Sequence, residues 1–197
     1  MIKGIELYEK IAEDYYKTHF DINEIKKIAD FFIQNLKGQK ILDIGCGPGR
    51  DAKYFSEHGL DVTGIDLTSN FVKIASRNVP NAEFIQMDMK SLNFPENTFD
   101  SIWACASFLH IPKEDAENTL LGFRKVLKPT GLICISVKQG VGEKFVEKKE
   151  YKGRTRFFAF YNKNEFKNLI ESCNFKIIKV MIDKKKETWI NVFATKE

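Results

Sequence analysis

The sequence lacks the features that would place the chain in a membrane or around a structural metal. It contains no apolar run long enough to span a bilayer, and its first residues are charged too early for a secretory signal. Its four cysteines form no CxxC pair, and no histidine lies at zinc-ligand spacing from them. We therefore expect a cytoplasmic protein with reduced thiols, no membrane association and no metal site.

Excess charge of one sign is also scarce. The net charge of +4 comes from basic residues scattered along 197 residues, so no basic stripe typical of nucleic-acid binding is formed. The chain has no internal repeat, low-complexity tract or linker. Its length suits one domain, residues 1–197, built on a three-layer α/β core.

Short apolar segments alternate with helical segments through most of the chain. Alternation of this kind predicts a mostly parallel sheet with helices on both faces. A linker of only residues 183–186 joins the last two segments, and a connection that short permits only an antiparallel hairpin. The predicted strands cover residues 40–44, 61–66, 83–87, 99–106, 132–137, 175–182 and 187–195, and two helices are expected before them, over about 7–20 and 24–36.

A glycine-rich loop, DIGCGPG, follows the first predicted strand at residues 43–49. Glycines let the backbone turn sharply and approach a ligand at the edge where open α/β sheets bind ligands. The dinucleotide fingerprint needs a glycine at position 50, where this chain has Arg50, and Pro48 offers no N–H to a phosphate. Asp43 would repel a pyrophosphate but suits an ammonium group. The loop therefore disfavours an NAD-dependent oxidoreductase.

Two further acids end the next two predicted strands. Asp66 stands where an acidic side chain can bind ribose hydroxyls, and Asp88 stands where it can read an adenine amino group. A helix cap at Asp66 and a surface turn at Asp88 are the structural alternatives. Three acids ending three successive strands suit a ligand with a cationic amino-acid end, a ribose and a neutral base.

The order and spacing of these motifs resemble the class I S-adenosylmethionine-dependent methyltransferases. The similarity runs from about Lys40 to the C-terminus through DIGCGPG, VTGID, IQMDM, FDSIWACASFLHI and LKPTGLICISV. It implies a Rossmann-like seven-stranded sheet with an antiparallel C-terminal hairpin. It also implies S-adenosylmethionine as cofactor and S-adenosylhomocysteine as product. YEKIAEDYY is similar to the lid helix of small-molecule members, so residues 1–37 are expected to form lid helices.

The resemblance also implies cofactor contacts. The glycine loop passes beneath the methionine moiety, Asp43 lies near its amino group, the backbone at Ala104 in the fourth strand lines its side, and Tyr15 or Tyr16 closes over it. Residues at the ends of the second and third strands contact the ribose, the face of the adenine and its edge. The expected cofactor-binding residues are Tyr15, Tyr16, Asp43, Gly45, Cys46, Gly47, Gly49, Asp66, Leu67, Asp88, Met89 and Ala104.

The sequence says less about the residues that bind the methyl acceptor. His110, just beyond the fourth strand, is a candidate catalytic base, and a structural hydrogen bond of a loop histidine is the alternative. Residues 138–161 follow the fifth strand and are expected to cap the acceptor. Arg154, Arg156 and Tyr161 are the candidate substrate contacts there, although cap packing and solvated charge also explain them.

The sequence thus predicts methyl transfer to a small-molecule acceptor by a monomer or homodimer. Methylation of a nucleic acid or a protein is an alternative. The Asn/Asp-Pro-Pro-aromatic motif usual for nitrogen acceptors of that kind is replaced here by residues 104–107, ACAS. A non-catalytic protein that binds S-adenosylmethionine is a further alternative, because a fold and a cofactor site do not establish catalysis.

Overall fold

A computed structural model of the chain describes residues 5–147 and 155–197. Its centre is a seven-stranded sheet in the order β3-β2-β1-β4-β5-β9-β8. The last two strands run antiparallel, and β9 is inserted between β5 and β8. The fold predicted from the sequence is therefore confirmed. The strands are β1 (Lys40–Ile44), β2 (Asp61–Asp66), β3 (Glu83–Gln86), β4 (Phe99–Cys105), β5 (Leu127–Lys138), β8 (Phe175–Lys184) and β9 (Thr188–Lys196).

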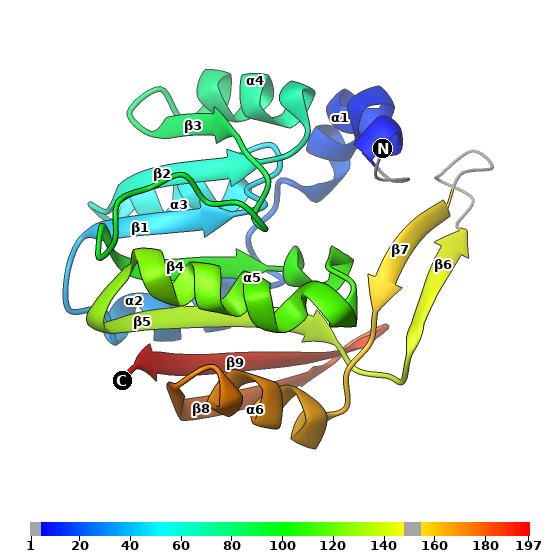
Figure 1. Cartoon of the computed structure of the whole chain (residues 1–197). Helices are drawn as coiled ribbons and strands as arrows, with labels where there is room; N and C mark the ends of the chain where they lie inside the picture. The colour runs from blue at the N-terminus through cyan, green and yellow to red at the C-terminus, as the bar shows by residue number, and fades with distance from the viewer. Residues whose placement is uncertain (1–4, 148–154) are drawn as a thin grey trace.

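Helices cover both faces of the sheet (Figure 1). In that view α5 (Lys113–Val126) and α6 (Lys163–Ser172) lie in front, and α2 (Lys26–Gln34) and α3 (Arg50–Glu57) lie behind. α4 (Ser69–Asn78) covers the end of the sheet formed by β2 and β3, and α1 (Ile5–His19) lies beside it at the carboxyl ends of the strands. No helix among the described residues is long and apolar enough to cross a membrane.

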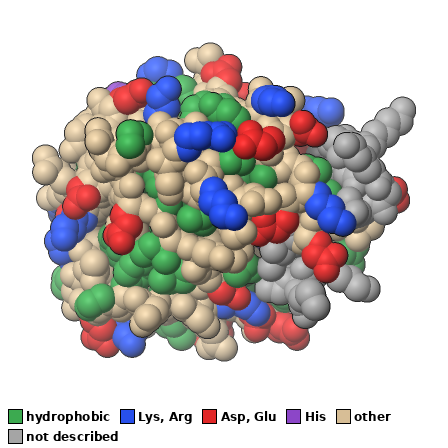
Figure 2. All heavy atoms as spheres, turned by 90° about the horizontal axis from the view of Figure 1, so that it is seen from above, with side chains coloured by type: hydrophobic (Ala, Val, Ile, Leu, Met, Phe, Trp, Pro, Cys, Tyr) green, Lys and Arg blue, Asp and Glu red, His purple; other side chains and the backbone are tan. Residues whose placement is uncertain are grey.

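The face of the molecule that lies at the top of Figure 1 carries charges of both signs. Figure 2 shows lysine, arginine, aspartate and glutamate side chains interspersed over this face, without a field of one sign. This distribution agrees with the small net charge of the chain. On this face, therefore, the basic stripe that would mark a nucleic-acid footprint is not formed.

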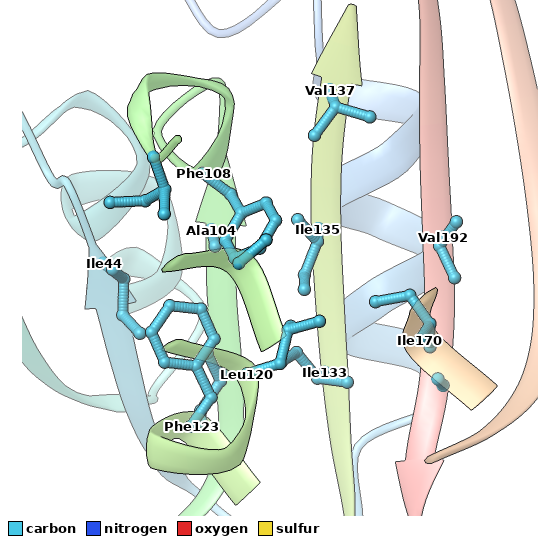
Figure 3. Close-up of a cluster of buried hydrophobic side chains, with 14 of the residues drawn as sticks. Ile44, Ala104, Phe108, Leu120, Phe123, Ile133, Ile135, Val137, Ile170 and Val192 are labelled. Atoms are coloured by element: carbon cyan, nitrogen blue, oxygen red, sulfur yellow. The ribbon is translucent and has the colours of Figure 1, made fainter. Parts of the chain in front are cut away.

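The core in front of the sheet fixes the fourth strand and the segment that follows it. Aliphatic side chains of β1, β4 and β5 meet the rings of Phe108 and Phe123 (Figure 3). Phe108 opens a short 3-10 helix, η1 (Phe108–His110), and its ring lies 6.0 Å from that of Phe123 in α5. Packing of this kind holds the chain after β4 against the front layer.

The core behind the sheet contains α2. Phe32 of this helix is fully buried, and its ring lies 5.0 Å from Trp103 and 5.7 Å from Phe55. α2 was expected to belong to a lid, but its burial against β4 and α3 makes it part of the rear layer. Of the two N-terminal helices, α1 is the one that lies at the carboxyl edge of the sheet.

The segment after β5 contains an unpredicted hairpin. β6 (Glu143–Glu147) and β7 (Thr155–Ala159) form a separate two-stranded sheet that stands beyond the carboxyl ends of the parallel strands (Figure 1). The hairpin lies within residues 138–161, the expected acceptor cap. A capping box begins the helix after it, α6: the Asn162 side chain accepts from the Glu165 N–H at 2.9 Å, and the Glu165 carboxylate accepts from the Asn162 N–H.

Candidate active site

A cavity of about 450 Å³ lies at the carboxyl ends of the parallel strands. Its floor is made by the segments that follow β1, β2, β3 and β4, and its roof by α1 and the β6–β7 hairpin. β1 and β4 are neighbours in the sheet, yet the chain leaves β1 toward the rear layer and β4 toward the front layer. Ligands of open α/β sheets bind where the strand order reverses in this way.

The glycine loop forms the wall of the cavity nearest β1. Gly45, Gly47 and Gly49 all have positive φ, at 72°, 53° and 89°, a conformation that disfavours other residues. A Cβ on Gly45 would lie 2.4 Å from the Cβ of Ser107, whereas a Cβ on Gly47 would meet no atom within 4 Å. The backbone at Gly47 therefore faces open space, and a ligand can approach it closely.

Asp66 lies beside this loop, on the cavity wall at the end of β2. One carboxylate oxygen accepts the Gly47 N–H at 3.0 Å and the other accepts the Thr68 N–H at 2.8 Å. Burial raises the pKa of Asp66, and these backbone donors oppose the increase. Two carboxylate oxygens retain further acceptor capacity, so Asp66 can also accept from the hydroxyl groups of a bound ligand.

The far end of the cavity lies after β2 and β3. Leu67, Asp88 and Met89 line it, and one Asp88 carboxylate oxygen accepts the Lys90 N–H at 2.9 Å. An apolar side chain, an acid and a flexible thioether thus face the same space. This combination can pack against the face of a flat base and accept a hydrogen bond from its edge.

Asp43 lies beneath the loop and does not itself line the cavity. It is 2% exposed, and its Oδ2 atom is buried without a hydrogen-bond partner in the described part of the chain. Burial raises the pKa of this carboxyl well above its usual range, and the charge of Asp51 adds to the increase. An unpaired buried oxygen is costly, so a cation on the cavity side of Asp43 would be stabilised, directly or through a water molecule.

Arg50 and Asp51 belong to the site but were missed as site residues. The Arg50 Nε–H donates to Asp51 Oδ1 at 2.6 Å, and the Trp103 indole N–H donates to Asp51 Oδ2 at 2.8 Å. Burial opposes the charge on the guanidinium, but the charge and hydrogen bond of Asp51 outweigh it and raise the pKa of Arg50. The signal in the sequence is Arg50 itself, which directly follows the last loop glycine, at the position where the dinucleotide fingerprint has a third glycine.

The end of the cavity beneath the β6–β7 hairpin contains His110. Its Nδ1 lies 2.7 Å from the carbonyl oxygen of Phe157, so Nδ1 carries the proton and Nε2 keeps a lone pair. Nε2 lies 3.4 Å from the Tyr8 hydroxyl and 3.4 Å from an Arg156 nitrogen. Burial lowers the pKa of His110 to about 4, so the ring is neutral at physiological pH.

Tyr8 was also missed, although the spacing of the helix offered a signal. Its ring packs edge-on against Tyr15, seven residues later on the same face of α1, at 5.9 Å. The Arg156 guanidinium lies 4.4 Å above the Tyr8 ring. Burial lowers the pKa of Arg156 to about 10, which leaves it charged at neutral pH. The roof therefore presents a phenol and a cation next to His110.

Several predicted residues lie elsewhere. Tyr15 lines the cavity, but Tyr16 packs edge-on against Phe20 and lies outside the cavity lining. Ala104 is fully buried in the front core (Figure 3), because β4 continues to Cys105 and the chain turns at Ala106, with φ 58°. Cys105 and Ala106 line the cavity in its place.

The remaining substrate candidates separate in the same way. Arg156 lines the cavity, whereas Tyr161 is 1% exposed in the core, with its ring 5.0 Å from that of Phe166. Arg154 lies outside the described residues. Within the ranges that the structure describes, no three potential ligand side chains gather where they could hold a metal ion.

Comparison with known proteins decides which family has this arrangement. Residues 41–131 match the methyltransferase domain family. The chain is 31% identical over 183 residues to a phosphoethanolamine N-methyltransferase of Plasmodium falciparum, an alignment that covers 88% of this chain and 67% of the relative. The chain belongs to the class I S-adenosylmethionine-dependent methyltransferases.

Another relative agrees with this assignment, and solved structures of lower identity share the fold. A phosphoethanolamine N-methyltransferase of Triticum aestivum is 36% identical over 141 residues, which are 68% of this chain but 27% of the relative. A methyltransferase structure from Methanosarcina mazei has a TM-score of 0.77 at 21% identity and covers 83% of this chain and 96% of that one. A Burkholderia thailandensis 1,6-didemethyltoxoflavin-N1-methyltransferase with bound S-adenosylhomocysteine has a TM-score of 0.75 at 20% identity, with 97% and 88% covered.

The buried carboxyl of Asp43 generates a prediction for the protein without cofactor. Because its pKa is raised in the folded state, this carboxyl contributes a loss of stability as pH rises above about 4, where the unfolded chain ionises. We expect Asp43→Asn to remove this slope, which is at most about 1.4 kcal/mol per pH unit. Urea unfolding between pH 4.5 and 8 measures it, and equal slopes for the two proteins would contradict the assignment.

The position of Asp66 generates a second prediction. Asp66→Ala should weaken S-adenosylmethionine binding by about 1–3 kcal/mol, because ligand hydroxyls would lose their acceptor. Asp61→Ala is the matched control, since Asp61 is an exposed acid at the opposite end of the same strand. Calorimetric titration of both folded variants makes the comparison. Unchanged affinity in Asp66→Ala would refute the contact.

Proposed function

We propose that the chain transfers the methyl group of S-adenosylmethionine to the nitrogen of a small amine that carries an anionic group. The arrangement of His110, Tyr8 and Arg156 at one end of a cavity whose other end suits the cofactor is the observation that carries this proposal. The names of the P. falciparum and T. aestivum relatives, phosphoethanolamine N-methyltransferases, fit this acceptor class.

The residues of the cavity fit the cofactor part by part. Gly45, Cys46 and Gly47 would contact the methionine moiety through their backbone, Gly49 would shape the loop, and the unpaired oxygen of Asp43 would face its ammonium group. Along the wall, Asp66 would bind the ribose, Leu67 would pack on the adenine face, and Asp88 and Met89 would contact its edge. Cys105 and Ala106 would lie beside the methionine moiety, and Tyr15 would cover the cofactor from the roof.

When bound, the cofactor supplies an electrophilic methyl group on a sulfonium, and the protein must align a nucleophile with it. Alignment of bound reactants can contribute about 7–11 kcal/mol. An amine attacks through its lone pair, so a protonated acceptor must first lose a proton. Nε2 of His110 is unprotonated and can accept it in exchange for the 3.4 Å contacts that it makes with Arg156 and Tyr8, and the Tyr8 hydroxyl is close enough to share or relay the proton.

Arg156 gives the acceptor an anchor and affects the base. Its charge, 3.4 Å from Nε2, disfavours a proton on His110. An anionic group of the acceptor that pairs with Arg156 would offset this charge and raise the pKa of His110 toward the range of an effective base. An acceptor with both an amine and an anion would thus supply the nucleophile and strengthen the base that activates it.

The cytoplasmic location expected from the sequence stays a prediction, and so does the choice between monomer and homodimer. Nucleic-acid or protein methylation and cofactor binding without turnover are the alternatives. Both are separated from the proposal by turnover measurements with defined acceptors. The mixed charges over the face in Figure 2 give the nucleic-acid alternative no support.

The acceptor class is tested with matched amines. Purified protein is incubated with S-adenosylmethionine and either ethanolamine or phosphoethanolamine, and formation of S-adenosylhomocysteine and of the methylated amine is measured by mass spectrometry. We expect the phosphorylated amine to be methylated faster, and Arg156→Met to abolish the difference. Lys144→Met, on the exposed part of the same hairpin, should preserve it. Cofactor binding without methylation of either amine would contradict this acceptor class.

His110 generates a prediction about rate. His110→Ala should lower the turnover number by roughly 10²- to 10⁴-fold, the range for loss of a general base, with little change in cofactor affinity. His58→Ala is the control, since His58 ends α3 and is bonded to the Tyr54 carbonyl at 2.7 Å, outside the cavity lining. Single-turnover kinetics separates chemistry from binding. Full activity of His110→Ala would leave this histidine with a structural role alone.

A further inference from the structure

The N-terminus of α4 has no cap of its own. The residue before the helix, Thr68, makes no side-chain capping hydrogen bond. The first N–H groups of a helix have no partner within the helix and must be satisfied from outside. Here they follow the segment from Asp66 to Thr68, which lines the cavity, so the group that satisfies them is close to the proposed cofactor site.

Glu9 of α1 supplies the missing acceptor. One of its carboxylate oxygens accepts the Ser69 N–H at 2.6 Å, and the other accepts the Asn70 N–H at 3.0 Å. The Asn70 side-chain amide returns a bond to the Glu9 carbonyl at 2.8 Å. A carboxylate at a helix N-terminus is further stabilised by the helix dipole. Glu9 therefore binds the roof of the cavity to its wall across sixty residues of sequence.

Aromatic contacts beside Glu9 connect α4 and α1 to His110 in the cavity. Tyr8, its neighbour in sequence, packs on Phe71 of α4 at 5.4 Å, and Tyr15 packs on the same ring at 5.4 Å. The hydroxyl of Tyr8 lies 3.4 Å from Nε2 of His110. Both roof tyrosines therefore pack on Phe71, in the first turn of α4.

The same turn is bonded to the acid expected to hold the ribose. Thr68 donates its N–H to Asp66 at 2.8 Å, and the next two N–H groups go to Glu9. Asp66, the first turn of α4, Glu9 and Tyr8 therefore form one continuous set of contacts. It runs from the cofactor end of the cavity to His110 at the acceptor end.

We infer that Glu9 is a positioning residue that holds α1 over the bound cofactor and sets Tyr8 against His110. The inference rests on the proposed function, since it assumes that the cavity binds S-adenosylmethionine. Glu9 itself does not line the cavity, so its effect reaches the reaction through Tyr8, Tyr15 and the start of α4.

Glu9→Gln tests this inference, because the amide keeps the size of the side chain but loses one of the two acceptors. Dissociation of S-adenosylhomocysteine is followed by stopped-flow fluorescence, and amide hydrogen exchange is measured on the protein without cofactor. We expect dissociation to be about tenfold faster, the effect of losing a charged hydrogen bond. We also expect faster exchange confined to α1 and to the amides of Ser69 and Asn70.

Glu13→Gln is the matched control. Glu13 also joins α1 to α4, but its partner Arg77 lies at 3.3 Å on the exposed end of the helix, where an ion pair contributes little. This variant should behave like the wild type. Glu9→Asp, which keeps the charge on a shorter side chain, should be intermediate and serves if the Gln variant fails to fold.

The outcomes are distinct. Wild-type dissociation and exchange in Glu9→Gln, or equal changes in Glu9→Gln and Glu13→Gln, would overturn the positioning role. Failure of the wild type itself to bind S-adenosylhomocysteine would instead overturn the proposed function.

Discussion

The divergence of the chain after β1 and β4 is the constraint on which the rest of the site depends. The two strands are paired in the centre of the sheet, but the segments that follow them go to opposite layers, and a crevice is left between them. Three loop glycines with positive φ turn the chain on the β1 side of the crevice and leave the backbone at Gly47 open to a ligand. On the β4 side, Ser107 fixes the turn by donating to the Ile44 carbonyl at 2.6 Å.

The groups in this crevice are arranged for a ligand more than for the stability of the empty protein. Asp43 has a buried oxygen without a partner among the described residues, and the partly buried Arg50 pairs with Asp51. Burying a carboxyl or a guanidinium in this way costs free energy unless the group is paired. A ligand with a cationic amino-acid end would offset part of this cost, so cofactor recognition and folded stability are linked through the same few residues.

The cofactor half of the site could be predicted from sequence because its signals are local. The glycine loop follows β1, Asp66 ends β2 and Asp88 lies two residues past β3, and parallel strands bring their carboxyl ends to one edge. The acceptor half depends on distant contacts: Tyr8 meets His110 across 102 residues, and Arg156 meets it across 46. No local pattern contains such pairs, so the helical spacing could place Tyr8 on the same face as Tyr15 but could not predict its contact with His110.

The errors in the predicted site concern which residue of a strand or helix faces the cavity, whereas the strand and the helix themselves were predicted. The resemblance implied that the backbone at Ala104 lines the cavity, but Ala104 lies inside β4, and the residues at the end of this strand, Cys105 and Ala106, line the cavity instead. Tyr16 lies about 100° around the helix from Tyr15, which is enough to direct it toward Phe20 instead of the cavity.

Calorimetric titration of the purified chain with S-adenosylhomocysteine and, in parallel, with NAD tests the central claim most directly. The account predicts saturable one-to-one binding of S-adenosylhomocysteine and none of NAD, since Asp43 and Pro48 suit an amino-acid end and oppose a pyrophosphate. Binding of NAD without S-adenosylhomocysteine would contradict the assignment of the cavity.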